Sequence, residues 1–97
     1  MKIYIAGKIS GLPYDEVRER FNNKKKELLT EWAEVANPIE ISPYIEGKGW
    51  SDYMKDCIRE ITTCDAVYLL NGWEDSKGAR AELEVARVLG LEIIYEG

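Results

Sequence analysis

Apolar residues in this chain form short runs that alternate with longer stretches of helical spacing. Four short runs rich in β-branched and aromatic residues predict strands over Lys2–Ala6, Glu34–Ala36, Asp65–Leu70 and Leu91–Tyr95. Three stretches with apolar positions at helical spacing predict helices over about Tyr14–Trp32, Ser51–Thr63 and Lys77–Leu89. The stretch Ile39–Gly49 is broken by proline and glycine, so it is expected to be irregular.

Strands separated by helices predict an α/β fold on a parallel sheet. The economical layout is a flavodoxin-like (Rossmann-like) three-layer sandwich of about four strands in the order 2-1-3-4. That order puts a switch point between the first and third strands, which are followed by Gly7–Pro13 and Asn71–Lys77. We expect both loops to border one crevice. A length of 97 residues predicts a single domain over residues 1–97.

Glu82 is the first candidate for chemistry. Its neighbours on the last predicted helix are Gly78, Ala79, Val85 and Ala86, all small or apolar, so its side chain faces the protein. A carboxylate on an inward face, near a helix start that follows a strand, suits a nucleophile in a ligand site. The alternative is a structural ion pair with a nearby lysine or arginine.

Tyr4 and Asp56 are further candidates. Tyr4 lies inside the first strand, where its hydroxyl needs a partner, either a catalytic carboxylate or a backbone group. Asp56, on the second long helix, either reaches the crevice or stays in solvent, and spacing does not decide between these. Asp65 precedes the third strand, far from its carboxyl end, so we expect it to serve the helix-to-strand turn.

Two loops carry groups that could bind a ligand. The loop after the first strand contains Gly7, Lys8 and Ser10, which could present N–H groups and a cation to a phosphate, although it lacks a Walker pattern. Ser76 and Gly78, at the start of the last helix, offer a second anion contact, and Ser76 alternatively serves only as the helix N-cap.

Three tryptophans are many for so short a chain. Trp32 follows the apolar stripe of the first helix and is expected in the core. Trp50 and Trp73 fall in predicted loops near the crevice. Each could stack on a flat ligand such as a nucleobase, or close a small core.

Composition removes several classes of function. The chain has no histidine, which excludes Ser-His-Asp and Cys-His catalysis and histidine-ligated metals, and we expect no metal and no cofactor. A net charge of -5 argues against binding a nucleic-acid polymer. Cys57 and Cys64 would lie about 10 Å apart on one helix, so they are expected to be free buried thiols. With no signal peptide and no long apolar run, we expect a cytoplasmic protein without a membrane partner.

Three segments carry a resemblance to a known family: Tyr4–Gly7, Cys64–Leu70 and Gly72–Glu82, the last with the pattern Gly-Trp-Glu-x-Ser-x-Gly-Ala. Together they resemble the nucleoside 2-deoxyribosyltransferase-like superfamily, and more narrowly its small bacterial and phage branch, DUF4406. The resemblance spans nearly the whole chain, and the third pattern is specific to that branch.

The resemblance implies a site for nucleosides or nucleotides. In the deoxyribosyltransferases and a related deoxyribonucleoside-monophosphate hydrolase, a glutamate four residues after a glycine attacks the sugar's anomeric carbon, and these positions correspond to Gly78 and Glu82. By the same resemblance Tyr4 would position the nucleophile, Ser76 would contact a phosphate, and Gly7 matches the glycine after the first strand.

One departure from the family bears on activity. The aspartate that handles the leaving base in relatives falls at Cys57 here, with Asp56 beside it.

The leading expectation from the resemblance is an N-glycosidase or a deoxyribosyltransferase. Two alternative functions stay open. One is a non-catalytic nucleotide sensor or sponge, and the other is a structural or partner-binding domain. A small-molecule nucleotide or nucleoside and a second copy in a homodimer are the expected partners.

Overall fold

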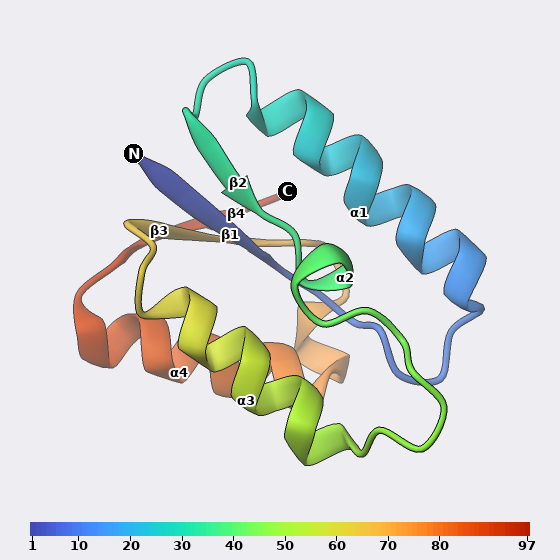
Figure 1. Cartoon of the computed structure of the whole chain (residues 1–97). Coiled ribbons are helices and arrows are strands. Elements are labelled where there is room, and N and C mark those ends of the chain that lie inside the picture. The colour runs from blue at the N-terminus through green and yellow to red at the C-terminus, as the bar shows by residue number, and fades with distance from the viewer.

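A computed structural model describes the whole chain, Met1–Gly97 (Figure 1). The strands are β1 (Lys2–Ala6), β2 (Glu34–Ala36), β3 (Ala66–Leu69) and β4 (Glu92–Tyr95). The helices are α1 (Tyr14–Leu28), α2 (Pro38–Ile41), α3 (Trp50–Ile61) and α4 (Lys77–Leu89), with a short 3-10 turn η1 (Trp73–Asp75) before α4.

The four strands form one parallel sheet in the order β2-β1-β3-β4, as the sequence predicts. Tyr4 in β1 pairs with Ala36 of β2 on one side and with Val67 of β3 on the other. Helix α1 covers one face of the sheet, and α3 and α4 cover the opposite face (Figure 1). The flavodoxin-like three-layer arrangement is confirmed.

Alternation along β1 separates two apolar cores. Ile3 and Ile5 face α1, where they pack with Phe21 in a cluster on that side of the sheet. Tyr4 faces the other way, into the cluster beneath α3 and α4, where Ile61 and other apolar side chains surround it. The strand therefore delivers one hydroxyl into an otherwise apolar layer.

Helix α1 is shorter than its apolar pattern predicts. It ends at Leu28 rather than Trp32, because the Thr30 amide and hydroxyl both donate to the Glu27 carbonyl, which tightens the chain into a turn. Trp32 therefore lies outside the helix, and its half-buried side chain packs against the edge of the core on the α1 side instead of within it.

The connection expected to be irregular contains the short helix α2. Pro38 occupies its first turn, and the Asn37 side chain accepts a hydrogen bond of 3.1 Å from the Ile39 amide, a capped start that pattern reading missed. Helix α3 begins at Trp50, one residue earlier than predicted, with Gly49 at the cap position, and it ends at Ile61, two residues before the predicted end.

The predictions for Asp65 and for the two cysteines are confirmed. Gly90 ends α4 with a positive φ of 72°. Asp65 accepts a hydrogen bond of 2.9 Å from the Lys2 amide, so it ties the turn before β3 to the start of β1. Cys57 and Cys64 are free and buried. No helix combines the length and apolar character needed to cross a bilayer.

Gly7 sits where three elements meet. A Cβ built on it would lie 2.9 Å from Leu70 Cδ1 and 3.1 Å from Phe21 Cζ, so the first residue after β1 has no room for a side chain. At Gly78 a Cβ would meet the flexible Met54 side chain, with Sδ at 3.2 Å. The two glycines therefore differ in what they tolerate.

We predict that Gly7→Ala lowers the free energy of unfolding by about 1–3 kcal/mol, since overpacking forces core side chains to shift. Gly78→Ala is the matched control. The atom that its Cβ would meet most closely belongs to the flexible Met54 side chain, which can move aside, so the net effect is expected to be small. Urea denaturation of both variants measures this, and equal losses would contradict the packing explanation.

Candidate functional site

The centre of the site is a hydrogen bond between two residues that lie 78 positions apart. The Tyr4 hydroxyl donates to Glu82 Oε2 at 2.7 Å. Tyr4 is fully buried in β1, and Glu82 is only 5% exposed in the second turn of α4. The open question about the Tyr4 partner is thus answered by a carboxylate. No lysine or arginine pairs with Glu82, and nearby Arg87 pairs with Glu84 instead.

Burial controls the ionisation of this pair. Removal from water raises the pKa of Glu82 to about 7, although the hydrogen bond from Tyr4 opposes the rise. Burial also raises the pKa of the Tyr4 hydroxyl well above its usual value, and the nearby Glu82 charge adds to this effect. Tyr4 therefore remains a hydrogen-bond donor, while Glu82 changes its charge near neutral pH.

Cys57 from α3 completes the inner wall. It is 6% exposed, and burial raises the pKa of its thiol to about 11, with the Tyr4 hydroxyl opposing and the Glu82 charge reinforcing the rise. Such a thiol stays protonated at neutral pH. It is neither an activated nucleophile nor an effective proton donor.

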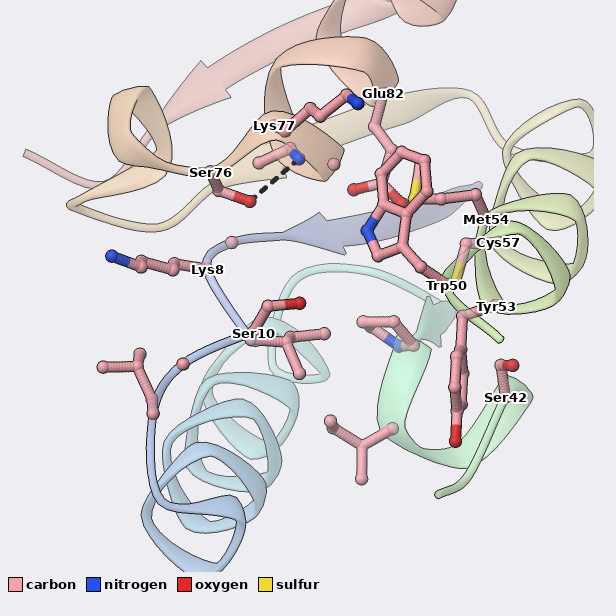
Figure 2. A pocket seen from close by; sticks show the side chains of 18 of the residues that line it. Lys8, Ser10, Ser42, Trp50, Tyr53, Met54, Cys57, Ser76, Lys77 and Glu82 are labelled. Atoms are coloured by element: carbon pink, nitrogen blue, oxygen red, sulfur yellow. Dashed lines mark hydrogen bonds between the residues drawn. The ribbon is translucent and has the colours of Figure 1, made fainter. Parts of the chain in front are cut away.

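These residues border a cavity of about 680 Å³, within the range of small-molecule sites. Its walls come from the loop after β1, from α2 and the residues that follow it, from the first turns of α3, and from the start of α4. Figure 2 shows Lys8, Ser10 and Ser76 on one side, and Trp50, Tyr53, Met54 and Cys57 on the other. The labelled side chains on the first side are polar or cationic, and those on the second are aromatic or apolar apart from Ser42.

The start of α4 presents unpaired donors to this cavity. Ser76 is the N-cap, as one of its two interpretations predicts, because its Oγ accepts from the Ala79 amide at 3.1 Å. Its carbonyl accepts from the Arg80 amide. The N–H groups of Lys77 and Gly78 have no partner in the chain, as is usual for the first turn of a helix, and they are suited to an anion.

Most of the predicted site residues lie together on this cavity. The lining includes Tyr4, Gly7, Lys8, Ser10, Ser76, Gly78 and Glu82. Trp73 is not part of it. Its ring packs 5.9 Å from that of Tyr95, in tilted contact, so it closes a small core beside β4.

Asp56 also lies outside the lining. Its carboxylate accepts a hydrogen bond of 2.8 Å from the Ser42 hydroxyl and pairs with Lys48 Nζ at 3.0 Å and with Arg59 at 3.3 Å. These contacts lower its pKa. Asp56 thus links α3 to the preceding loop, one helical position away from the wall that Cys57 occupies.

Sequence reasoning missed part of the lining. The sequence patterns give no binding role to Lys77, Tyr14, Tyr44 or Tyr53, although all four line the cavity. Each of them lies in a loop or in the first turn of a helix at the carboxyl edge of the sheet. This shared position is the sequence signal from which their place in the site could be predicted.

We predict that Glu82→Gln stabilises the fold above pH 7. The folded state keeps the Glu82 proton up to about pH 7 and the unfolded state only to its ordinary pKa of 4.5, so wild-type stability falls between these values as pH rises. Glutamine can still accept from Tyr4, so the variant's advantage should grow by roughly 3 kcal/mol from pH 4 to pH 8. Chemical denaturation at both pH values measures the change, with the exposed Glu84→Gln as control, and a pH-independent difference would refute it.

Comparison with known proteins completes the description of the site. In the structure, no three side chains of the metal-ligating types gather in one place. No curated protein matches the chain. One family model matches residues 1–95, which is nearly the whole length of the chain, and the family is described as a domain of unknown function, DUF4406. The chain therefore belongs to the DUF4406 family.

Proposed function

We propose that this protein binds a nucleotide or nucleoside and cleaves or transfers its N-glycosidic bond through Glu82. The observation that carries the proposal is a buried carboxylate, oriented by Tyr4, on the inner wall of a cavity of nucleotide size. The position of this wall at the carboxyl edge of a parallel sheet, where α/β folds place ligand sites, supports it. The resemblance to the nucleoside 2-deoxyribosyltransferase-like superfamily points to the same chemistry.

The reaction assigns separate tasks to the two oxygens of Glu82. Tyr4 holds Oε2, which leaves Oε1 to attack the anomeric carbon. The bond from that carbon to the base nitrogen breaks, and the base leaves with the bonding electron pair and takes up a proton. The resulting glycosyl ester is resolved by water in a hydrolase or by a second base in a transferase.

The two sides of the cavity suit the two ends of a nucleotide. Lys8, Ser10 and Ser76 offer a cation and hydroxyls to a phosphate or sugar. The opposite wall offers aromatic faces to a base, and Trp50 is the tryptophan that lines it. Glu82 lies between these sides, where the sugar would be placed (Figure 2).

We predict that the protein releases free base from at least one member of a panel of ribo- and deoxyribonucleosides and their monophosphates. Chromatography of the products measures the release. Glu82→Ala should abolish it, while Glu84→Ala, on the exposed side of the same helix, should retain it. Because attack requires ionised Glu82, the wild-type rate should rise with pH through about 7 and then level off. Release that persists in Glu82→Ala would refute the mechanism.

A second candidate function is binding without turnover, as a nucleotide sensor or sponge. The observation that favours it is Cys57, because a thiol with a pKa of about 11 gives little acid assistance to a departing base. Asp56, the adjacent carboxylate, is occupied by Ser42 and Lys48 and lies outside the lining.

We predict that Cys57→Asp raises the rate of base release by about 10²–10⁴-fold, the usual contribution of a positioned general acid. Cys57→Ser is the control, since it replaces the thiol without supplying a carboxyl group. If wild-type protein binds a panel member without cleaving it and Cys57→Asp restores release, the binding module is the native function. An unchanged rate in Cys57→Asp would show that position 57 does not limit the reaction.

A further inference from the structure

Two exposed side chains face each other at the cavity rim. Trp50 opens α3 and Lys77 opens α4, and Lys77 Nζ lies 5.0 Å from the centroid of the Trp50 ring (Figure 2). Both residues line the cavity, and Trp50 remains 46% exposed. A cation–π contact therefore links the aromatic side of the cavity to its cationic side.

Lys77 is one of four lysines in this chain that have no carboxylate partner. Lys2, Lys24, Lys25 and Lys48 each pair with an acidic side chain. Lys77 has only the indole face, although Asp75 lies two residues away on the same lining. Its charge is consequently available to an incoming anion.

Lys77 could interact either with the Trp50 ring or with an anion at the start of α4, and the contact with Trp50 is the weaker of these two. A cation–π contact at an exposed site is worth less than a charge-assisted hydrogen bond to a phosphate oxygen. The unpaired N–H groups of Lys77 and Gly78 and the Ser76 hydroxyl lie at the same helix start, so an anion held there gains several donors together. Moving the ammonium group toward that anion frees the face of Trp50 that it covers.

We propose that Lys77 and Trp50 form a coupled recognition pair that selects a nucleoside phosphate over an unphosphorylated nucleoside. The phosphate draws Lys77 from the indole, and the planar base of the same ligand stacks on the face thus released. The coupling favours ligands that carry both groups, since an anion alone leaves the indole bare and a base alone competes with the ammonium group. This inference rests on the proposed function and adds to it the class of ligand and two residues that choose it.

The experiment uses three probes that separate the parts of the ligand: adenosine 5′-monophosphate, adenosine and ribose 5-phosphate. Calorimetric titration measures their affinities for wild-type protein, Trp50→Leu and Lys77→Gln. Both residues are exposed, so these variants should fold. Lys77→Arg keeps the charge, and Lys26→Gln, an exposed lysine on α1, is the control for a general change of charge.

We expect Lys77→Gln to weaken the monophosphate and ribose 5-phosphate by about 10-fold while adenosine binds as well as before or better. Trp50→Leu should weaken the monophosphate and adenosine by about 10-fold, while ribose 5-phosphate binds as well as before or better, because Lys77 no longer has to leave the indole. Lys77→Arg should retain most of the affinity, and Lys26→Gln should match wild type.

Tryptophan fluorescence tests the exchange itself. Ribose 5-phosphate has no base, yet it should change the emission of wild-type protein by drawing Lys77 from Trp50, and this change should vanish in both Trp50→Leu and Lys77→Gln. If wild-type protein binds none of the nucleosides or nucleotides in the wider panel, the proposed function fails and this inference with it. If the protein binds a monophosphate but both variants bind all three probes like wild type, the pair plays no part and only this inference is overturned.

Discussion

The hydrogen bond from Tyr4 to Glu82 is the interaction on which the rest of this structure depends. It joins a central strand to the last helix inside a layer that is otherwise apolar, with Ala6, Ala79 and Ala86 in the same cluster. A carboxylate removed from water is costly unless a donor satisfies it. Small neighbours on α4 let the helix approach the sheet closely enough for Tyr4 to reach Glu82. The bond therefore fixes the inner wall of the cavity and the spacing between α4 and β1.

The loop that leads into α4 is fixed from the opposite side of the sheet. The Asn71 carbonyl accepts a hydrogen bond of 2.7 Å from Arg20 on α1, and the Asn71 amide donates to Glu96 Oε1 at 2.7 Å. Glu96 also pairs with Arg20 and with Lys24, so α1, the loop after β3 and the segment after β4 meet in one network. Because this loop precedes Ser76, the network helps to fix the start of α4 at the edge of the cavity.

Periodicity accounts for most of the fold and for the central residue of the site. Helical spacing around Glu82 is a local pattern that places its side chain on the inward face of α4. The β1 segment is an apolar run buried on both faces, so the sequence puts Tyr4 in the strand without showing which layer its hydroxyl enters. Strand order follows from the economy of right-handed crossovers. The sequence could not separate Trp50 from Trp73, because both fall in polar connections and only the packing of Trp73 on Tyr95 removes it from the cavity.

The contacts of Asp56 and the short helix α2 could not be predicted from the sequence for a related reason. Asp56 contacts Ser42 and Lys48, which both lie in the connection between α2 and α3. The path of this connection depends on α2, a helix of only four residues that is capped by Asn37. So short a helix has little periodicity to detect, and its stability comes from the cap and from packing rather than propensity. Polar contacts between such segments depend on how the segments pack in the folded chain, which local sequence patterns do not show.

Under the proposed function, binding and catalysis would make opposite demands on Glu82. A neutral Glu82 avoids repelling a phosphate and can donate a hydrogen bond to a ligand, whereas attack on a sugar requires the ionised form. Because burial holds the pKa of Glu82 at about 7, both forms are populated near neutral pH. The overall charge of -5 matters less than the cavity groups, since exposed carboxylates more than about 8–10 Å from a phosphate are largely screened at physiological salt. Besides Glu82, the charged side chains on the cavity lining are Lys8, Lys77 and Asp75. Under the proposed function, the difference between a sensor and an enzyme then lies in the proton that a departing base needs, at the position where Cys57 stands.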